Sequence, residues 1–320
     1  MIEVAGLTKD YGGTRAVDGL SFTVPAGAVT GFLGPNGAGK SSTMRMILGL
    51  DRPTRGTARI GGRRYRDFAA PMREVGALLD TEAVPPGMTA RAHLEWLALA
   101  GGLPKGRVRA SLDAVGLGAV ARRKVRQLSL GMRQRLGIAA ALLGDPGTLI
   151  LDEPVNGLDP EGVRWIRTLM RGLAAEGRTV LVSSHLMSEM AETADRVVVI
   201  GRGRLIAETG IDELTRHGAG GRVRVAGPTP APLAAVLGDA GFAVEWAPGG
   251  AALLVSGAEP AEVGGLAAHY GITLHELVQE RPSLEDVFMD LTRDSTEHAF
   301  AATGGAPSEQ RQSTAGRGPR

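Results

Sequence analysis

The sequence predicts an α/β protein built around a phosphate-binding loop, with a helical insertion and a smaller α+β unit nearer the C-terminus. Three features support this prediction. An apolar run at residues 29–33 breaks into a glycine-rich turn that opens a helix, and a second apolar run at 149–151 ends in two acidic residues. Residues 222–292 then alternate in the order βαββαβ. We therefore expect two domains in the chain.

The composition is that of a globular protein with a substantial core. The chain has 320 residues, of which 43% are apolar and 22% charged. A net charge of +2 gives little reason to expect nucleic acid or anionic lipid as a partner. Without cysteine there is no disulfide or thiolate metal site. No apolar run approaches the ~20 residues that span a bilayer, so we expect a cytoplasmic protein that reaches a membrane only through a partner.

The segment at residues 34–41 has the spacing G-x-x-x-x-G-K-S, which is typical of a loop that binds phosphate groups. It follows the apolar strand at 29–33 and precedes a predicted helix at 42–48. Glycine has no Cβ, so the backbone can curl with its N–H groups pointing inward and lie close to a polyphosphate. The N-terminus of the helix adds donors and a favourable dipole. We expect the phosphates of a nucleotide to bind here.

Lys40 and Ser41 are the polar side chains at the end of this loop. The ammonium of Lys40 would reach the β- and γ-phosphates, and the hydroxyl of Ser41 would bind Mg²⁺. Lysine occurs at four positions in a chain that otherwise uses arginine, and one of the four lies in this loop. A planar guanidinium is a poor substitute for an ammonium among backbone amides, so this choice favours a phosphate site over a plain glycine-rich turn.

The chain before the loop is predicted to form a hairpin. Short strand-like pieces at 2–4 and 22–24 flank a turn at Gly12-Gly13. Tyr11 stands directly before that turn. Its ring could stack on an adenine or pack on its hairpin neighbours, and the residues by themselves leave both interpretations open.

Beyond the loop helix, apolar runs at 58–60 and 75–79 indicate an edge strand and a buried strand, and the second ends at Asp80. The pattern then changes to helices, predicted at 92–100, 107–115 and 131–142. We interpret residues 85–143 as a helical subdomain inserted between strands of the α/β core. Ser129 is a candidate N-cap for the third helix.

The strand at 149–151 delivers Asp152 and Glu153 at its carboxyl end. The metal side of a phosphate site needs one carboxylate for Mg²⁺ and another for an attacking water, and parallel strands end at a common edge. A tight turn at 156–159 and a helix at 162–175 follow. The two acids are therefore expected to face the phosphate loop.

A buried strand at 180–182 ends in the triplet Ser-Ser-His at 183–185. A lone histidine is usually structural. One at the same sheet edge as the loop and the acids is expected to belong to the site. A further strand at 197–200 precedes a glycine turn, and the first domain is predicted to cover residues 1–217.

Residues 222–294 form a separate small unit. Its predicted strands lie at 222–225, 243–246, 252–255 and 272–278, and its helices at 233–240, 261–270 and 284–291. The order βαββαβ is typical of a ferredoxin-like sandwich. Residues 295–320 are rich in Gly, Ala, Ser, Gln and Arg without apolar periodicity, so we expect a disordered tail.

Taken in this order, the motifs make residues 1–217 resemble the ATP-binding cassette of ABC transporters. The matching segments are the Walker A loop at 34–42, the signature at 128–132, the Walker B strand at 149–153, the D-loop at 156–159 and the switch histidine at 185. The C-terminal unit, with Ser-Leu-Glu-Asp-Val-Phe at 283–288, is similar to the accessory domain of the drug-, antibiotic- and lipid-exporter branch. The resemblance implies a P-loop NTPase fold of the ABC type, with an inserted helical subdomain and a ferredoxin-like C-terminal domain.

The resemblance also implies which residues contact ATP and Mg²⁺. Nucleotide-binding residues would be Tyr11, Gly34, Pro35, Asn36, Gly37, Ala38, Gly39, Lys40, Ser41, Ser42, Ser129, Gly131 and Asp159. Mg²⁺ would be held by Ser41, Asp152 and Asp80. The catalytic residues would be Glu153, which orients or activates water, His185, which contacts the γ-phosphate, and Lys40.

A head-to-tail homodimer is a further implication of the resemblance. Each of two ATP molecules would lie between the Walker A loop of one subunit and Ser129 and Gly131 of the other. Closing and reopening this dimer would move an integral membrane permease, so the chain is expected at the inner face of the cell membrane.

Two positions depart from the pattern of the family. In the signature, Leu130 and Met132 replace a glycine and a glutamine. Asp80 stands where the family has the Q-loop glutamine. A carboxylate is shorter and donates no hydrogen bond, but it can hold a Mg²⁺-bound water, which needs only an acceptor. The alternative is that Asp80 is a solvated loop acid.

The expected function is ATP hydrolysis that powers export of a drug, antibiotic, lipid or similar compound. An importer subunit is the nearest alternative. A DNA-repair or chromosome ATPase would need a long coiled-coil insertion, and a translation-linked ATPase would normally carry two cassettes. Neither feature is found in this sequence.

Overall fold

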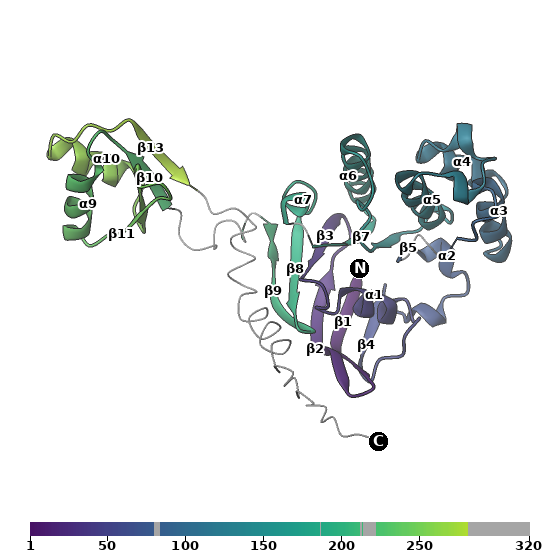
Figure 1. The fold of residues 1–320 in the computed structure, drawn as a ribbon. Coiled ribbons are helices and arrows are strands. Elements are labelled where there is room, and N and C mark those ends of the chain that lie inside the picture. The colour runs from purple at the N-terminus through teal and green to yellow at the C-terminus, as the bar shows by residue number, and fades with distance from the viewer. Residues whose placement is uncertain (80–83, 186, 212, 214–221, 281–320) are drawn as a thin grey trace, which may run out of the picture.

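The computed structural model describes residues 1–79, 84–185, 187–211, 213 and 222–280 (Figure 1). Asp80, the helix predicted at 284–291 and the tail at 295–320 lie outside the described residues, as does the motif at 283–288. Within the described chain, two sheets belong to the first part of the sequence and a third to the part after residue 221. The predictions for the outside segments stay predictions.

An antiparallel sheet near the N-terminus contains the predicted hairpin. β1 (Ile2–Tyr11) pairs with β2 (Thr14–Val24) and with β4 (Arg55–Ile60), in the order β2-β1-β4. Gly12 and Gly13 form the turn with φ angles of 53° and 96°, a backbone region that glycine enters at little cost. The strands are longer than the apolar runs suggested, because pairing continues to the residues beside the turn.

The central sheet positions the site. In spatial order its strands are β5 (Val75–Leu78), β6 (Thr148–Leu151), β7 (Thr179–Ser184), β3 (Ala28–Leu33), β8 (Arg196–Gly201) and β9 (Arg204–Gly210). The first five run parallel, and β9 runs antiparallel to β8. Strands buried on both faces have continuous apolar runs, which the sequence reveals. β9 is only half buried and lacks such a run, so sequence analysis missed it.

The helices of the first part are α1 (Lys40–Ile47), α2 (Pro71–Glu74), α3 (Ala90–Ala100), α4 (Gly106–Ala114), α5 (Leu130–Leu142), α6 (Pro160–Ala175) and α7 (Met187–Ala191), with 3-10 turns at Tyr65–Asp67, Gly118–Val120 and Val125–Gln127. α3, α4 and α5 gather beside β5 as the inserted helical subdomain (Figure 1). Thr89 and Ser129 cap α3 and α5, which therefore begin slightly earlier than predicted. None of the described helices is long and apolar enough to cross a bilayer.

The C-terminal unit has the predicted ferredoxin-like topology. Its elements are β10 (Arg222–Ala226), α9 (Pro230–Asp239), β11 (Ala243–Trp246), β12 (Ala252–Ser256), α10 (Pro260–His269) and β13 (Glu276–Glu280). The strands are antiparallel in the order β11-β12-β10-β13. β13 begins four residues later than predicted. The N–H of Ile272 donates to the Ala267 carbonyl instead, 2.8 Å away, as the chain leaves α10.

The central sheet separates two hydrophobic clusters. Along β7, Val180 and Val182 belong to one cluster and Leu181 to the other, which is the alternation of a strand buried on both faces. Phe22 of β2 stacks on Phe32 of β3 with ring centroids 5.2 Å apart. This contact fixes the antiparallel sheet against one face of the central sheet.

The packing of α5 on β5 leaves no space for a side chain at Gly76. A Cβ there would lie 2.0 Å from the Ala141 carbonyl oxygen. We expect Gly76→Ala to lower the free energy of unfolding by about 1–3 kcal/mol, as measured by chemical denaturation. Gly172→Ala in α6 is the control, since its Cβ would meet no atom within 4 Å, and it should be neutral or stabilising. Equal stability of the two variants would contradict this close packing.

Candidate active site

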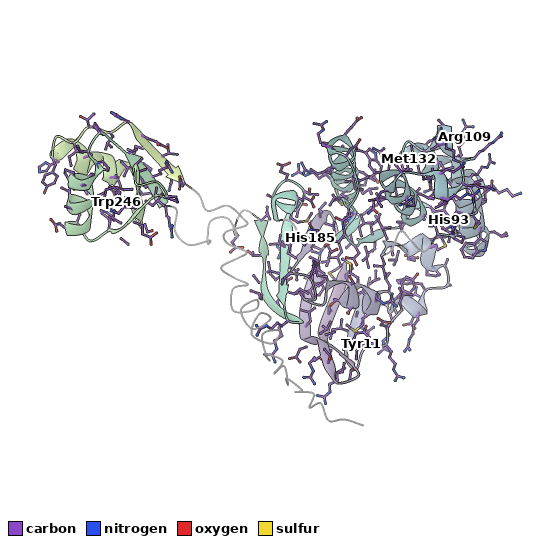
Figure 2. The ribbon with its side chains drawn as sticks, in the orientation of Figure 1. Tyr11, His93, Arg109, Met132, His185 and Trp246 are labelled. Carbon is purple, nitrogen blue, oxygen red and sulfur yellow. The ribbon has the colours of Figure 1, made fainter. Side chains whose placement is uncertain are left out.

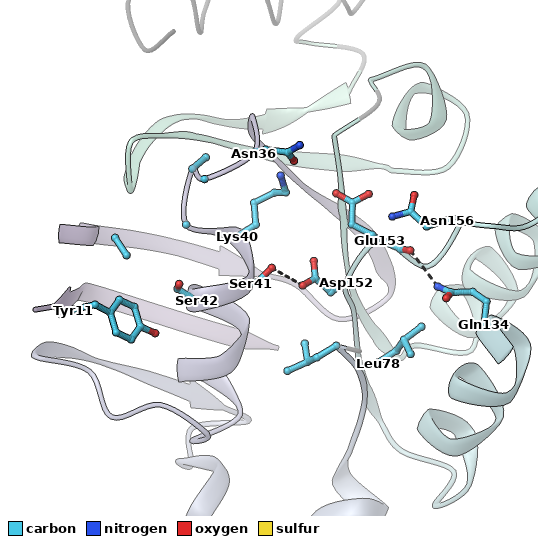
Figure 3. A pocket seen from close by; sticks show the side chains of 15 residues that line it. Tyr11, Asn36, Lys40, Ser41, Ser42, Leu78, Gln134, Asp152, Glu153 and Asn156 are labelled. Carbon is cyan, nitrogen blue, oxygen red and sulfur yellow. Dashed lines mark hydrogen bonds between the residues drawn. The ribbon is translucent and has the colours of Figure 1, made fainter. Parts of the chain in front are cut away.

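A cavity of about 560 Å³ opens where β3 and β6 end and α1 begins (Figure 3). Its lining residues are Tyr11, Ala16, Asn36, Gly37, Ala38, Gly39, Lys40, Ser41, Ser42, Leu78, Leu79, Gln134, Asp152, Glu153 and Asn156. One end combines backbone amides, an ammonium and two carboxylates, and the other holds an aromatic ring. Such a lining fits a ligand with a polyanionic end and a planar end.

The ammonium of Lys40 lies inside the loop. Its Nζ donates to the carbonyl oxygens of Gly34 at 2.6 Å and Pro35 at 3.3 Å, and the residue is 7% exposed. Burial lowers the pKa of Lys40, and the negative charges of Glu153 and Asp152 oppose this shift. A desolvated ammonium gains from any further anion placed beside it, so the loop is suited to a phosphate.

Two glycines allow the curl of the loop. Gly37 and Gly39 have φ angles of 80° and 102°, which residues other than glycine rarely adopt. A Cβ on Gly39 would also lie 2.5 Å from the carbonyl oxygen of Ala16. The glycines at these positions are therefore required by the backbone geometry as well as by the approach of a ligand.

Ser41 and Asp152 meet as predicted for the metal side of the site. The Ser41 hydroxyl donates to Asp152 Oδ2 at 2.7 Å, and the hydroxyl of Ser183 donates to Oδ1 of the same carboxylate. Hydroxyl and carboxylate oxygens are the hard ligands that Mg²⁺ prefers, and this ion usually takes few protein ligands beside phosphates and water. The residues present therefore fit Mg²⁺.

Glu153 is held in an unusual backbone conformation. Its φ is 49°, a region that residues other than glycine rarely occupy and that is often found at functional sites. Its N–H donates to the Ser183 hydroxyl at 2.9 Å, and its carbonyl accepts from Gln134 Nε2 at 3.1 Å. Its side-chain Oε2 lies 2.8 Å from His185 Nδ1. Two neighbours thus fix the backbone of Glu153 and a third contacts its carboxylate at the edge of the cavity.

The other predicted residues divide into two groups. Tyr11, at the end of β1, lines the cavity (Figure 3). His185 does not line it but contacts the carboxylate of Glu153, which does; Figure 2 labels Tyr11 and His185 within the whole chain. Ser129, Gly131 and Asp159 are not among the lining residues. Ser129 and Asp159 accept hydrogen bonds from the N–H groups of Met132 and Gly162 and so cap α5 and α6. Within one chain they stand apart from the cavity.

Gln134 and Ser183 belong to the site, although sequence analysis gave them no role there, and Asn156, the first residue of the predicted D-loop, lines the cavity. Gln134 is 4% exposed on α5, and a buried amide in a helix indicates a specific partner. Ser183 is fully buried at the end of β7 and bridges Asp152 and Glu153. A polar residue that ends an apolar strand was the signal available for Ser183.

Comparison with known proteins gives consistent matches. Residues 17–156 match the family model described as ABC transporter, and residues 221–285 match one described as a domain of unknown function. The chain is 43% identical over 220 residues to the bacitracin transport ATP-binding protein BcrA of Enterococcus faecalis, covering 68% of this chain and 71% of that protein. It is 42% identical over 218 residues to the daunorubicin/doxorubicin resistance ATP-binding protein DrrA of Streptomyces peucetius, covering 67% of this chain and 66% of that protein.

Solved structures that match this chain are also ATP-binding chains of ABC transporters. An ATP-binding subunit of an ABC transporter matches with a TM-score of 0.61 and 30% identity, over 68% of this chain and 92% of that one. A dimeric post-hydrolysis state of the ATP-binding cassette MJ0796, bound to ADP and Pi, matches with a TM-score of 0.60 and 26% identity. The match covers 66% of this chain and 99% of that one.

Ser183→Ala should destabilise the protein, because it leaves a partly buried Asp152 carboxylate oxygen and the Glu153 N–H without this partner. We expect a loss of about 1–3 kcal/mol in the free energy of unfolding, measured by denaturant titration. Thr30→Val in β3 is the matched control: its buried hydroxyl has no partner among the described residues, so the isosteric change should be neutral or stabilising. A loss for Thr30→Val as large as that for Ser183→Ala would contradict the bridging role.

Proposed function

This chain belongs to the ABC transporter family, and from that premise we propose that it is the ATP-hydrolysing subunit of an exporter. One observation supports ATP hydrolysis most directly: a single cavity joins a phosphate loop with its enclosed Lys40 to the Ser41–Asp152 pair and to Glu153. The enclosed ammonium and the loop N–H groups would hold the phosphates.

Mg²⁺ would be held by Ser41 and Asp152, and when bound it would neutralise charge on the phosphates. Ser183 positions the carboxylate of Asp152 for this role through its hydrogen bond. Asp80 stays a predicted contact to a Mg²⁺-bound water, since it lies outside the described residues.

Glu153 would accept a proton from the attacking water. Its Oε2 lies 2.8 Å from His185 Nδ1, and its other oxygen would face the water. The backbone of Glu153 donates to the Ser183 hydroxyl and accepts from the Gln134 amide, and these bonds support its left-handed conformation without help from substrate. His185 would orient this carboxylate and contact the γ-phosphate, as the resemblance implies.

Export through a separate integral membrane permease is supported by the names of the relatives. These include transport ATP-binding proteins for bacitracin and a lantibiotic, a daunorubicin/doxorubicin resistance protein and a Nod factor export protein. An importer role has no comparable support. We place the chain at the inner face of the cell membrane, as the permease-bound ATPase.

A head-to-tail homodimer would complete the site. Ser129 and Gly131 lie outside the cavity of their own chain, where they can contribute to that of a second copy. The N-terminus of α5, capped by Ser129, is suited to an anionic group approaching from outside. Each ATP would then contact a loop from one subunit and a signature from the other.

Glu153→Gln should nearly abolish ATP turnover while ATP binding is retained, because the amide keeps the shape but cannot accept a proton. Steady-state phosphate release and nucleotide titration measure the two effects. Lys40→Ala is the contrasting variant, and it should weaken nucleotide binding itself by about 1.5–3 kcal/mol. Turnover of Glu153→Gln near the parent rate would overturn the role of Glu153.

Ser129→Asp should block turnover without weakening ATP binding to a monomer. The carboxylate keeps the N-cap of α5 but brings negative charge toward the γ-phosphate of the partner subunit. Mixing this variant with Lys40→Ala subunits should restore part of the activity, because one composite site then has an intact loop and an intact signature. Folded mixed dimers with no activity would contradict the head-to-tail arrangement, unless both sites must fire together. The parent protein should therefore also be assayed under conditions that prevent dimerisation. Turnover equal to that of the dimer would show that the site is complete in one chain, and would contradict the head-to-tail arrangement.

A further inference from the structure

The loop that follows α1 contacts the aromatic end of the cavity. Asp51 lies four residues beyond the last residue of α1, and its backbone N–H donates to the Arg45 carbonyl at 3.3 Å. Its carboxylate accepts two hydrogen bonds from the Arg45 guanidinium, at 2.9 and 3.3 Å. The loop is therefore tied to α1, the helix that begins at the phosphate end of the cavity.

The same carboxylate accepts a hydrogen bond from the hydroxyl of Tyr11, with a distance of 2.7 Å to Asp51 Oδ2. Arg45 and Tyr11 lower the pKa of Asp51, in that order of effect, so it is ionised at neutral pH. Burial and the bond to Asp51 raise the pKa of Tyr11, which keeps the hydroxyl protonated as the donor. A charge-assisted bond of this kind is stronger than a neutral one.

Lys9 occupies one face of the Tyr11 ring. Its Nζ lies 4.8 Å from the ring centroid and donates to the carbonyl of Arg52 at 2.7 Å, in the loop that carries Asp51. The ring is thus held at its hydroxyl and covered on one face, although Tyr11 is 44% exposed and lines the cavity. An exposed tyrosine at a hairpin turn would otherwise rotate freely about its side-chain bonds.

We propose that Asp51 is a positioning residue for nucleotide binding, which holds the Tyr11 ring ready to receive the base while α1 holds the phosphates. The inference rests on the proposed function, since it needs a nucleotide in this cavity. It assigns Asp51, Arg45 and Lys9 a role in recognition of the base that the loop motif does not contain. Fixing the ring before binding removes the cost of ordering it when the base arrives.

The test compares ATP with inorganic tripolyphosphate, which has phosphates but no base. Dissociation constants for both are measured by calorimetry in the full chain, with Mg²⁺ present, for the parent, Asp51→Ala and Asp51→Asn. We expect Asp51→Ala to weaken ATP binding by about 2- to 10-fold and to leave tripolyphosphate binding unchanged. Asp51→Asn keeps an acceptor oxygen and should retain part of the ATP affinity.

Tyr11→Phe keeps the ring but removes its hydroxyl, so it should match Asp51→Ala in direction. If the two residues act through one bond, the double variant should bind ATP no more weakly than the weaker single variant. Glu95→Ala, which breaks the exposed ion pair with Arg91 in α3, is the control for loss of a surface carboxylate and should change neither constant.

Equal weakening of ATP and tripolyphosphate binding by Asp51→Ala would show that Asp51 acts on the phosphate loop through α1, and would overturn the proposal. Unchanged ATP binding would overturn it as well. A parent protein that binds tripolyphosphate as tightly as ATP would exclude base recognition while leaving the phosphate site intact. A parent that binds neither ligand would instead overturn the proposed function.

Discussion

The parallel pairing of β3, β7 and β6 is the constraint on which the site depends. Leu33 pairs with Ser184 and Leu151 with Val182, so the three strands leave the sheet at a common edge. The phosphate loop, the two acids and the histidine are the residues that follow. A shift of one residue in any pair would exchange the two buried faces of a strand, so burial of the core fixes the register and thereby the site.

Much of this arrangement could be predicted because it depends on order along the chain. Apolar runs reveal strands buried on both faces, and the residue after each run is then a candidate for the common edge. The bond between Gln134 and Glu153 could not be predicted in this way, because it depends on how α5 packs against β5 in three dimensions. Sequence analysis also missed β9, because a half-exposed edge strand has no continuous apolar run.

The bridging hydroxyl of Ser183 shows how the core and the site share one residue. It is fully buried, as a core position requires, yet it donates to Asp152 and accepts from the Glu153 N–H. A left-handed backbone conformation at a residue such as Glu153 carries a conformational strain of order 1–3 kcal/mol, and it persists only where the surrounding structure stabilises it. Stability of the sheet edge and placement of Glu153 are therefore coupled.

α1 links the two ends of the cavity. The helix has eight residues and is about 12 Å long, with Lys40 at its first position and the loop that carries Asp51 beyond its last. The Tyr11 hydroxyl donates to Asp51 in that loop, so the ring is connected to the phosphate loop through α1. Gln134 reaches the cavity from the helical subdomain and bonds the Glu153 carbonyl. A movement of α5 would therefore act on the backbone of Glu153 through this hydrogen bond.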